Sequence, residues 1–249
     1  MKILIIGDKC TDRFIYGTID RICPEAPVPV FNPSHQKENQ GMAGNVYANI
    51  KSLISDKDGE VELITNTTDI LKERYVDKKS NQMLLRVDSN DKCDQISNSV
   101  LETIEWSNYG AVVVSDYCKG FLTEENIKHI VNSHPLTFVD TKKEIGEWIE
   151  SATFIKINQP EYTRNQKRFE EINLKGDLIV TLGEAGVQYN NKVYPPTEVI
   201  EALDLSGAGD TFLSGLVVDY LETGDIEHAI QYANACALVV VQQKGVTVI

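Results

Sequence analysis

Long apolar runs and an excess of positive charge are both missing from this sequence. Its 249 residues contain 24 Lys and Arg against 37 Asp and Glu, a formal net charge of −13. A membrane span needs about 18 consecutive apolar residues, which no run here approaches, and nucleic-acid binding needs clustered Lys and Arg. We therefore expect no membrane insertion and no nucleic-acid partner. Small anions remain open as ligands, because a few local cations are enough to bind them.

Cysteine and histidine are also scarce. The five cysteines are odd in number and form no C-x-x-C pair, which favours reduced thiols over a disulfide framework. The four histidines show no H-x-x-x-H spacing, so no zinc site is expected. The opening apolar run, residues 3–6, is too short for a signal peptide. We therefore expect a cytoplasmic protein.

The composition that remains is globular, with 42% hydrophobic and 24% charged residues. Short β-branched runs alternate with amphipathic stretches. We expect strands at residues 3–6, 61–65, 111–115, 136–140, 154–157 and 178–181, and helices at 41–54, 123–131, 207–222 and 225–243. This alternation predicts a single α/β domain over residues 1–249, with a mostly parallel central sheet between two helical layers.

Two regions break the alternation. Residues 14–31 contain strand-like runs interrupted by three prolines, a density that a central strand excludes. Residues 82–88 read as an isolated strand. We expect the two regions to form a small β-sheet lid, with strands at roughly 12–31 and 82–89. Residues 55–75 are expected to hold one strand and little else.

The sharpest feature is the segment Asp204-Leu205-Ser206-Gly207-Ala208-Gly209-Asp210, which opens an apolar helix. Free backbone N–H groups at a helix start, together with the helix dipole, attract phosphate oxygens. Its two glycines let the backbone approach a ligand closely. Asp210 would stand beside a bound phosphate and accept a hydroxyl proton, as phosphoryl transfer requires.

Other Gly-rich motifs are excluded at this segment. A G-x-G-x-x-G dinucleotide fingerprint would need Gly at 212, where Phe212 stands. A G-x-S-x-G nucleophile elbow would need Gly at 204, where Asp204 stands, and the P-loop pattern is absent. A plain Gly-rich turn, with Asp210 as an ordinary N-terminal acid of a packed helix, stays open from this segment alone.

The same segment resembles the D-[TVL]-[TS]-G-A-G-D signature of the PfkB/ribokinase family of sugar kinases. Further family motifs follow in order, and they are similar to Gly7-Asp8, Gly41-Met42-Ala43-Gly44-Asn45, Asn158-Gln159-Pro160-Glu161 and Thr181-Leu182-Gly183-Glu184-Ala185-Gly186. Several ordered motifs are more specific than one Gly-rich loop. The resemblance implies a ribokinase-like three-layer fold with a β lid, ATP and Mg²⁺, and a sugar hydroxyl as acceptor.

Within that family the chain is most similar to heptose 7-phosphate kinases of the bifunctional heptose kinase/adenylyltransferase type. The likeness spans nearly the whole chain, at residues 7–14, 21–30, 81–88, 115–120 and 139–142. Residues 24–29, Pro-Glu-Ala-Pro-Val-Pro, separate this group from generic ribokinases. The likeness implies phosphoryl transfer to the anomeric hydroxyl of a heptose 7-phosphate, and a homodimer formed through the lid.

The resemblance also implies roles for individual residues. Asp210 takes the catalytic-base position, and the amides of residues 207–209 would hold the transferring phosphoryl group. Asn158 and Glu161 match positions that act on ATP phosphates and on Mg²⁺, the glutamate through metal-bound water. The nucleotide side is completed by Thr181, Gly183, Gly186 and Asn234.

The acceptor side is expected to combine hydroxyl-binding groups with positive charge. The residues that match sugar-facing positions are Asp8, Asp12, Gly41, Asn45, Asp116 and Asp140. A phosphate on the acceptor needs local cations, and planar Arg suits it best. The cations at matching positions are Arg13, Arg86, Lys119 and Lys142. The competing interpretation of these four cations is that they form surface ion pairs. The competing interpretation of Asp116 is that it caps the end of a strand.

The chain departs from the family pattern at several places. Met42 stands where the family usually has a second Gly, so the backbone approach to the sugar is expected to differ. Residues 55–75 and 161–177 are shorter than in the relatives. Because the first of these segments lies near the lid, substrate identity and dimerisation depend on it most. An adenylylation step is expected to belong to another protein.

Two alternative functions stay open. A kinase of the same fold for another sugar, sugar phosphate or nucleoside would share these motifs. A non-catalytic nucleotide- or sugar-binding protein on a reduced kinase scaffold would explain the shortened segments, although Asp210, Asn158 and Glu161 argue against it.

Overall fold

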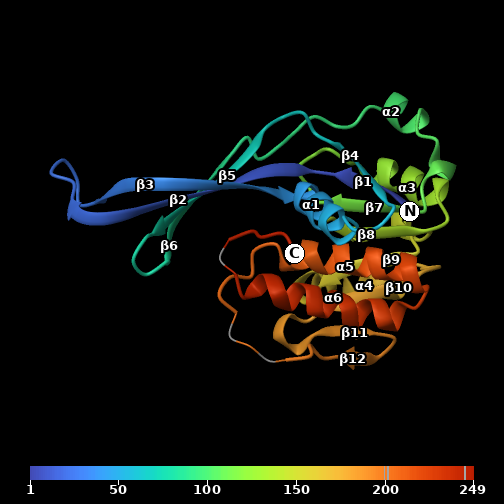
Figure 1. Ribbon diagram of the computed structural model, residues 1–249. Helices are drawn as coiled ribbons and strands as arrows, with labels where there is room; N and C mark the ends of the chain where they lie inside the picture. Colours follow the sequence, from blue (N-terminus) through green and yellow to red (C-terminus); the bar gives the residue numbers. More distant parts are fainter. Residues whose placement is uncertain (199, 201, 244) are drawn as a thin grey trace.

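A computed structural model describes residues 1–198, 200, 202–243 and 245–249 of the chain. Its strands form a sheet of eight in the body and a sheet of four that extends away from it (Figure 1). The strands are β1 Lys2–Gly7, β2 Lys9–Ile22, β3 Pro29–Met42, β4 Glu60–Thr65, β5 Ile70–Asp77, β6 Met83–Ser89, β7 Ala111–Asp116, β8 Thr137–Thr141, β9 Phe154–Asn158, β10 Asp177–Thr181, β11 Val187–Tyr189 and β12 Lys192–Tyr194. The helices are α1 Ala43–Leu53, α2 Asn98–Glu102, α3 Glu124–Ser133, α4 Gln159–Glu171, α5 Ala208–Thr223 and α6 Ile226–Val241.

The body sheet has the strand order β12-β11-β10-β9-β8-β7-β1-β4. The six strands from β10 to β4 pair in parallel, and β11 and β12 add an antiparallel edge. In β1, Ile3 and Ile5 join the core on one face while Leu4 and Ile6 join the core on the other. Successive side chains point to opposite faces, so a strand covered on both sides is apolar throughout.

Helices cover both faces of this sheet and complete three layers. Helices α1, α5 and α6 pack on one face through residues such as Val46 and Leu216, and α2, α3 and α4 lie on the other through residues such as Leu101 and Ile127. The predicted α/β sandwich is confirmed, with every predicted strand and helix of the body found within about two residues of its expected bounds. No helix among the described residues is long and apolar enough to cross a membrane.

The four-stranded sheet is the lid, with the order β3-β2-β5-β6. Its long β2–β3 hairpin projects from the body (Figure 1). The prediction of lid strands at 12–31 and 82–89 was too small, because β3 continues to Met42 and β5 was missed. Strand β5 pairs in parallel with β2 and antiparallel with β6, so the expectation that residues 55–75 hold only one strand was wrong. Charges at Lys72, Glu73 and Arg74 interrupt its apolar pattern and hide the strand in the sequence.

The junction of lid and body has an unusual backbone at Met42. This residue precedes α1 with φ 58° and ψ −134°, a conformation that favours glycine. Its side chain is buried with Cys10 and Ile70. Met42 therefore keeps a glycine-like chain path and fills the root of the lid with a side chain.

Candidate active site

The polar residues of the predicted site gather at the carboxyl edge of the body sheet. Asp116 ends β7, Asp140 lies near the end of β8, Asn158 ends β9 and Thr181 ends β10. Parallel strands place their carboxyl ends at the same edge, where ligands of such sheets bind. The start of α5 brings Asp210 to the same cavity as Asp140, Asn158 and Thr181.

Asp210 is buried in the first turn of α5, with 4% of its surface exposed. Tyr117 Oη donates a hydrogen bond to one carboxylate oxygen at 2.5 Å, and Asn45 Nδ2 donates to the other at 3.1 Å. Burial raises the pKa of Asp210 to about 6, although both hydrogen bonds act to lower it. A carboxylate with this pKa is ionised at neutral pH and is still basic enough to accept a proton.

The backbone before Asp210 forms a tight turn at the place where the sequence predicts anion binding. Gly207 precedes the helix with φ 83°, a left-handed conformation that favours glycine. A Cβ on Gly207 would lie 2.8 Å from Asn45 Nδ2, so a side chain there would displace the asparagine that holds the base. The Ala208 N–H is bonded to the Leu205 carbonyl at 3.3 Å, and the first helical bond runs from Thr211 to Gly207. The N–H groups of Gly209 and Asp210 lie between these two bonds and are the ones that a helix start leaves for an anion. Of the predicted amides 207–209, that of Ala208 already has a backbone partner.

Lys156 adds a cation beside this turn. Its Nζ pairs with Asp140 at 2.6 Å and lies 3.1 Å from where a Cβ on Gly209 would stand. Both charged side chains line the cavity and are 5% exposed. The motif analysis missed Lys156, although a lysine inside the apolar strand Phe154–Asn158 was a usable signal.

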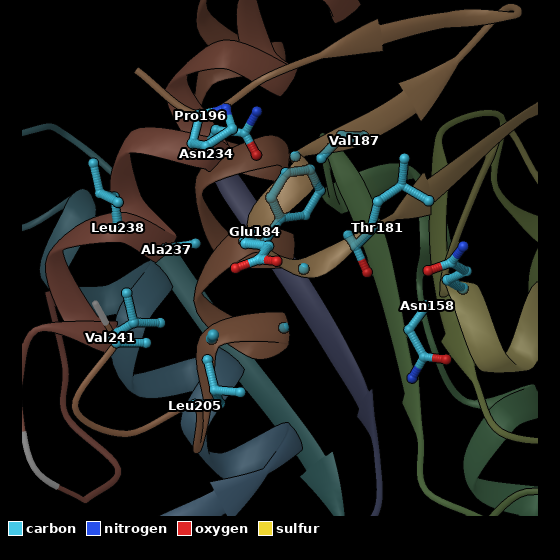
Figure 2. A pocket seen from close by; sticks show the side chains of 18 of the residues that line it. Asn158, Thr181, Glu184, Val187, Pro196, Leu205, Asn234, Ala237, Leu238 and Val241 are labelled. Atoms are coloured by element: carbon cyan, nitrogen blue, oxygen red, sulfur yellow. The ribbon is translucent and has the colours of Figure 1, made fainter. Parts of the chain in front are cut away.

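A cavity of about 640 Å³ extends from Asp210 along the strand ends. In Figure 2, Ala237 and Leu238 of α6 form an apolar side of the cavity, while Thr181 and Asn158 lie across from them. An apolar wall with a few placed polar groups is typical of nucleotide and cofactor sites.

Thr181, Gly183, Gly186 and Asn234 all line this cavity, as the nucleotide-side prediction requires. Gly186 has φ 93°, and a Cβ there would lie 2.1 Å from the Tyr194 carbonyl oxygen. Asn234 Nδ2 donates to the same oxygen at 3.1 Å. These contacts join the end of β12 to Gly186 and to α6, and they leave no room for a larger residue at 186.

Asn158 and Glu161 cap α4 reciprocally. The Asn158 side chain accepts the Glu161 N–H at 2.9 Å, and the Glu161 carboxylate accepts the Asn158 N–H at 2.8 Å. Lys142 Nζ lies 3.1 Å from the other Glu161 oxygen. Asn158 and Lys142 stand at the cavity wall, with the 6%-exposed Glu161 behind them.

The position of Glu161 behind the cavity wall bears on how these residues would bind Mg²⁺. No group of three or more His, Cys, Asp or Glu within the described ranges could hold a metal ion directly. A carboxylate set behind the wall reaches a metal through a bound water, and Mg²⁺ keeps much of its hydration shell. The donor set therefore fits an ion held by phosphates and water, with Glu161 acting indirectly.

Two predicted sugar contacts lie on the lid side of the base. Asp12 is 5% exposed and forms an ion pair with Arg74. A Cβ on Gly41 would lie 2.1 Å from Asp12 Oδ2, which explains the glycine. Together with Asn45, these residues form the junction between the lid and the start of α1.

Asp8 and Asp116 hold the framework instead of facing the cavity. Asp8 is fully buried and accepts the N–H groups of Tyr117 and Phe121 at 2.6 and 3.2 Å. Asp116 pairs with Lys143 at 3.3 Å, and burial raises the pKa of its carboxyl. In this structure Asp8 anchors the loop that follows β7, and Asp116 bonds within its own strand end. The sugar contacts of both residues stay predictions.

The predicted phosphate-binding cations outside the cavity are already paired. Along β2, Arg13 alternates with the inward-facing Asp12 and so points to the outer face of the lid. The pairs are Arg13 with Glu38 and Glu73, Arg86 with Asp88, and Lys119 with Asp91. The structure does not bring Arg13 to the base, and surface ion pairs describe it.

Tyr117 is the contact to the base that sequence reasoning overlooked. It lies within the recognised segment 115–120, but no role was predicted for it. Burial, and then the charge of Asp210, raise the pKa of its hydroxyl well above the usual value. Lys142 Nζ lies 4.5 Å from its ring centre. Tyr117 thus connects the base with a cation of the nucleotide side.

Solved structures of sugar kinases share this fold. Ribokinase from Thermotoga maritima matches with a TM-score of 0.70 at 17% identity, covering 98% of this chain and 94% of that chain. Ribokinase from Arabidopsis thaliana, solved with ribose and ATP, matches with a TM-score of 0.66 at 14% identity, covering 98% and 93%. At these identities the matches show the fold alone. The fold class of this chain is therefore ribokinase-like α/β.

The family follows from the sequence. The pattern described as "pfkB family carbohydrate kinase" matches residues 42–249, and the chain belongs to that family. It is a carbohydrate kinase, a phosphotransferase with an alcohol group as acceptor. Kinases of this family take ATP and a sugar as small-molecule substrates.

Curated relatives carry the name "Bifunctional protein HldE". The protein from Vibrio atlanticus is 32% identical over 98% of this chain and 60% of its own length, and that from Helicobacter pylori is 30% identical over 98% and 63%. The chain thus spans about three-fifths of the length of these relatives. The Vibrio alignment covers 289 positions against 249 residues, so at least 40 positions are gaps in this chain.

Proposed function

We propose that this chain transfers the γ-phosphoryl group of ATP to the anomeric hydroxyl of a heptose 7-phosphate and so forms the 1,7-bisphosphate. The observation that carries the chemistry is Asp210, buried at a helix start between a nucleotide-sized cavity and the lid. The segment Pro24–Pro29 and the other subfamily motifs carry the choice of acceptor. The whole sequence 1–249 would act as one kinase domain.

In this proposal Asp210 accepts the proton of the attacking hydroxyl. Asn45 and Tyr117 hold the two carboxylate oxygens in place, and the acceptor hydroxyl approaches from the lid side. As charge moves onto the transferring group, the amides at the start of α5 and Lys156 stabilise it. These groups are already fixed before the reaction, so little reorganisation is needed.

ATP would occupy the cavity, with its base near Asn234 and its phosphates near Asn158 and the start of α5. Mg²⁺, when bound, neutralises phosphate charge, and Glu161 would contact its water shell. Closure of the lid would exclude water and suppress hydrolysis of ATP.

ADP release tests this proposal. The purified protein is mixed with MgATP and one acceptor at a time: D-glycero-D-manno-heptose 7-phosphate, ribose, fructose 6-phosphate or adenosine. We expect turnover with the heptose phosphate alone and its loss in Asp210→Asn. Turnover with another acceptor would keep the mechanism and overturn the substrate assignment. ATP binding without turnover on any acceptor would contradict the mechanism.

We also propose a cytoplasmic homodimer formed through the lid. Apolar side chains of β6 are exposed, with Met83 at 55% and Leu85 at 56%, and such a strand face favours pairing with a second copy. Light scattering should give the mass of a dimer, and Leu85→Asp should give a monomer. A monomeric unmodified protein at micromolar concentration would contradict this part.

A further inference from the structure

Lys72 is a buried lysine of the lid that no motif pointed to. It lies in β5, directly across from Asp12 of β2 and Asp88 of β6. Residues paired in register share a face of the sheet, so Lys72 is on the inner face with Asp12. Only 8% of Lys72 is exposed.

The other cations around Lys72 all have carboxylate partners. Arg74 pairs with Asp12, Arg86 with Asp88 and Lys119 with Asp91. Lys72 makes no ion pair with any residue that the structure describes. Burial lowers the pKa of Lys72, the charges of Cys10 and Asp12 oppose this, and those of Lys119 and Arg86 lower the pKa further. Asp12 and Asp88 face Lys72 across the strands, but each is bonded to an arginine, so Lys72 is buried without an ion-pair partner of its own. A ligand that supplied a negative charge would lower the cost of burying it.

The position of Lys72 relative to the base fits such a ligand. Its Nζ lies 5.9 Å from the ring centre of Tyr117, and the hydroxyl of that ring lies 2.5 Å from Asp210. Lys72 and the base are thus separated by about one aromatic ring. Lys142, on the same tyrosine, pairs instead with Glu161 of the nucleotide side.

We infer that Lys72 is the specificity-determining cation that binds the phosphate carried by the acceptor. A sugar ring placed with its reacting hydroxyl on Asp210 and its body along Tyr117 would extend its far phosphate toward Lys72. The pairs of Arg86 with Asp88 and of Lys119 with Asp91 are balanced in charge, so Lys72 supplies the excess positive charge for that phosphate. This inference rests on the proposed function, because it presumes an acceptor that is already phosphorylated.

The test compares phosphorylated and unphosphorylated acceptors in Lys72→Met. For the heptose 7-phosphate we expect KM to rise roughly 10- to 100-fold, as expected for loss of a charge-assisted hydrogen bond. The KM of ATP and the rate with unphosphorylated heptose should stay unchanged. Lys72→Arg should recover most of the affinity. Lys79→Met, which removes an exposed lysine of the same lid, is the matched control and should match the unmodified protein.

The melting temperature of Lys72→Met distinguishes a phosphate-binding role of Lys72 from a structural one. Removal of a buried lysine that makes no ion pair should leave Tm unchanged or higher. An unchanged preference for the phosphorylated sugar in Lys72→Met would overturn the inference while the proposed function stands. A lower Tm with equal losses on both sugars would overturn it as well.

A failure of the proposed function gives a different result, since the unmodified protein would then not phosphorylate the heptose phosphate. The preference of the protein for a phosphorylated sugar is then measured by binding. The shift in Tm produced by fructose 6-phosphate is compared with that produced by fructose. A preference for the phosphate that Lys72→Met abolishes would support the inference. No preference in the unmodified protein would overturn it.

Discussion

The body and the lid use their charged residues in different ways. In the body, Asp140, Lys156 and Asp210 converge on one cavity at the ends of parallel strands and the start of a helix. In the lid, Arg13, Arg74 and Arg86 each pair with a carboxylate of the same small sheet. Strand ends concentrate side chains at an edge, whereas strand faces spread them over two surfaces. The charges of the body thus converge on one point, whereas those of the lid neutralise one another within its sheet.

The largest expected effect comes from the base of the body. Asp210→Asn should lower kcat about 10²- to 10⁴-fold, the usual contribution of a general base, with little change in the KM of ATP. Steady-state kinetics at saturating acceptor measures this. A variant that retained more than about a tenth of the rate would show that another group takes the proton.

The helix start gives the next largest effect. Gly207→Ala would push a Cβ to 2.8 Å from Asn45 Nδ2 at φ 83°, and we expect kcat to fall roughly 10- to 100-fold because the base and the amides are displaced. Gly224→Ala is the matched control: it has φ 67° at the other end of α5 with nothing within 4 Å. It should cost about 1 kcal/mol of stability and leave kcat unchanged. Equal losses of activity in both variants would contradict the account.

Tyr117 tests how the junction with the lid tunes the base. Its hydrogen bond stabilises the ionised carboxylate and so lowers the pKa of Asp210, while burial raises that pKa to about 6. In Tyr117→Phe the pKa should rise above 6, and the acid limb of the pH–rate profile should move to higher pH. Activity should then fall most near pH 6, where fewer molecules hold an ionised base, and little at about pH 8.

Tyr109→Phe is the control for that profile, because the Tyr109 hydroxyl donates to Glu62, away from the cavity. Its acid limb should coincide with that of the unmodified protein. A Tyr117→Phe profile that moves to lower pH, or does not move, would contradict the proposed role of this hydrogen bond.

The smallest effect is expected on the outer face of the lid. Arg13→Met removes two partly exposed ion pairs, with Glu38 and Glu73, and such pairs contribute little. The KM of either substrate should change less than about twofold in steady-state assays. A tenfold rise in the acceptor KM would place Arg13 at the substrate and would remove the distinction between the two faces of the lid.

The sequence predicts the body better than the lid for physical reasons. Strands buried on both faces are apolar throughout, and the Gly-rich start of α5 depends on backbone properties of residues 207–210 that are local in sequence. Strand β5 was not predicted because its inner face carries the charged Lys72 and Arg74, and the ion-pair partner of Arg74 lies on another strand.

The contacts that were missed are all between residues distant in sequence. Tyr117 reaches Asp210 across 93 positions, and Lys156 reaches Asp140 from the neighbouring strand. The outward orientation of Arg13 depends on which face of β2 meets the body. Both faces of this strand are partly polar, so the sequence pattern does not show which of them is buried. The roles of these residues became visible only with the packing of lid on body.

The central claim is that the body transfers a phosphoryl group to the anomeric oxygen of an acceptor that the lid selects. The most direct test is ³¹P NMR of the product formed from MgATP and D-glycero-D-manno-heptose 7-phosphate. We predict ADP together with a new phosphate resonance coupled to the anomeric proton, and neither with Asp210→Asn. Inorganic phosphate as the only new product, or a phosphate on another carbon, would contradict the claim.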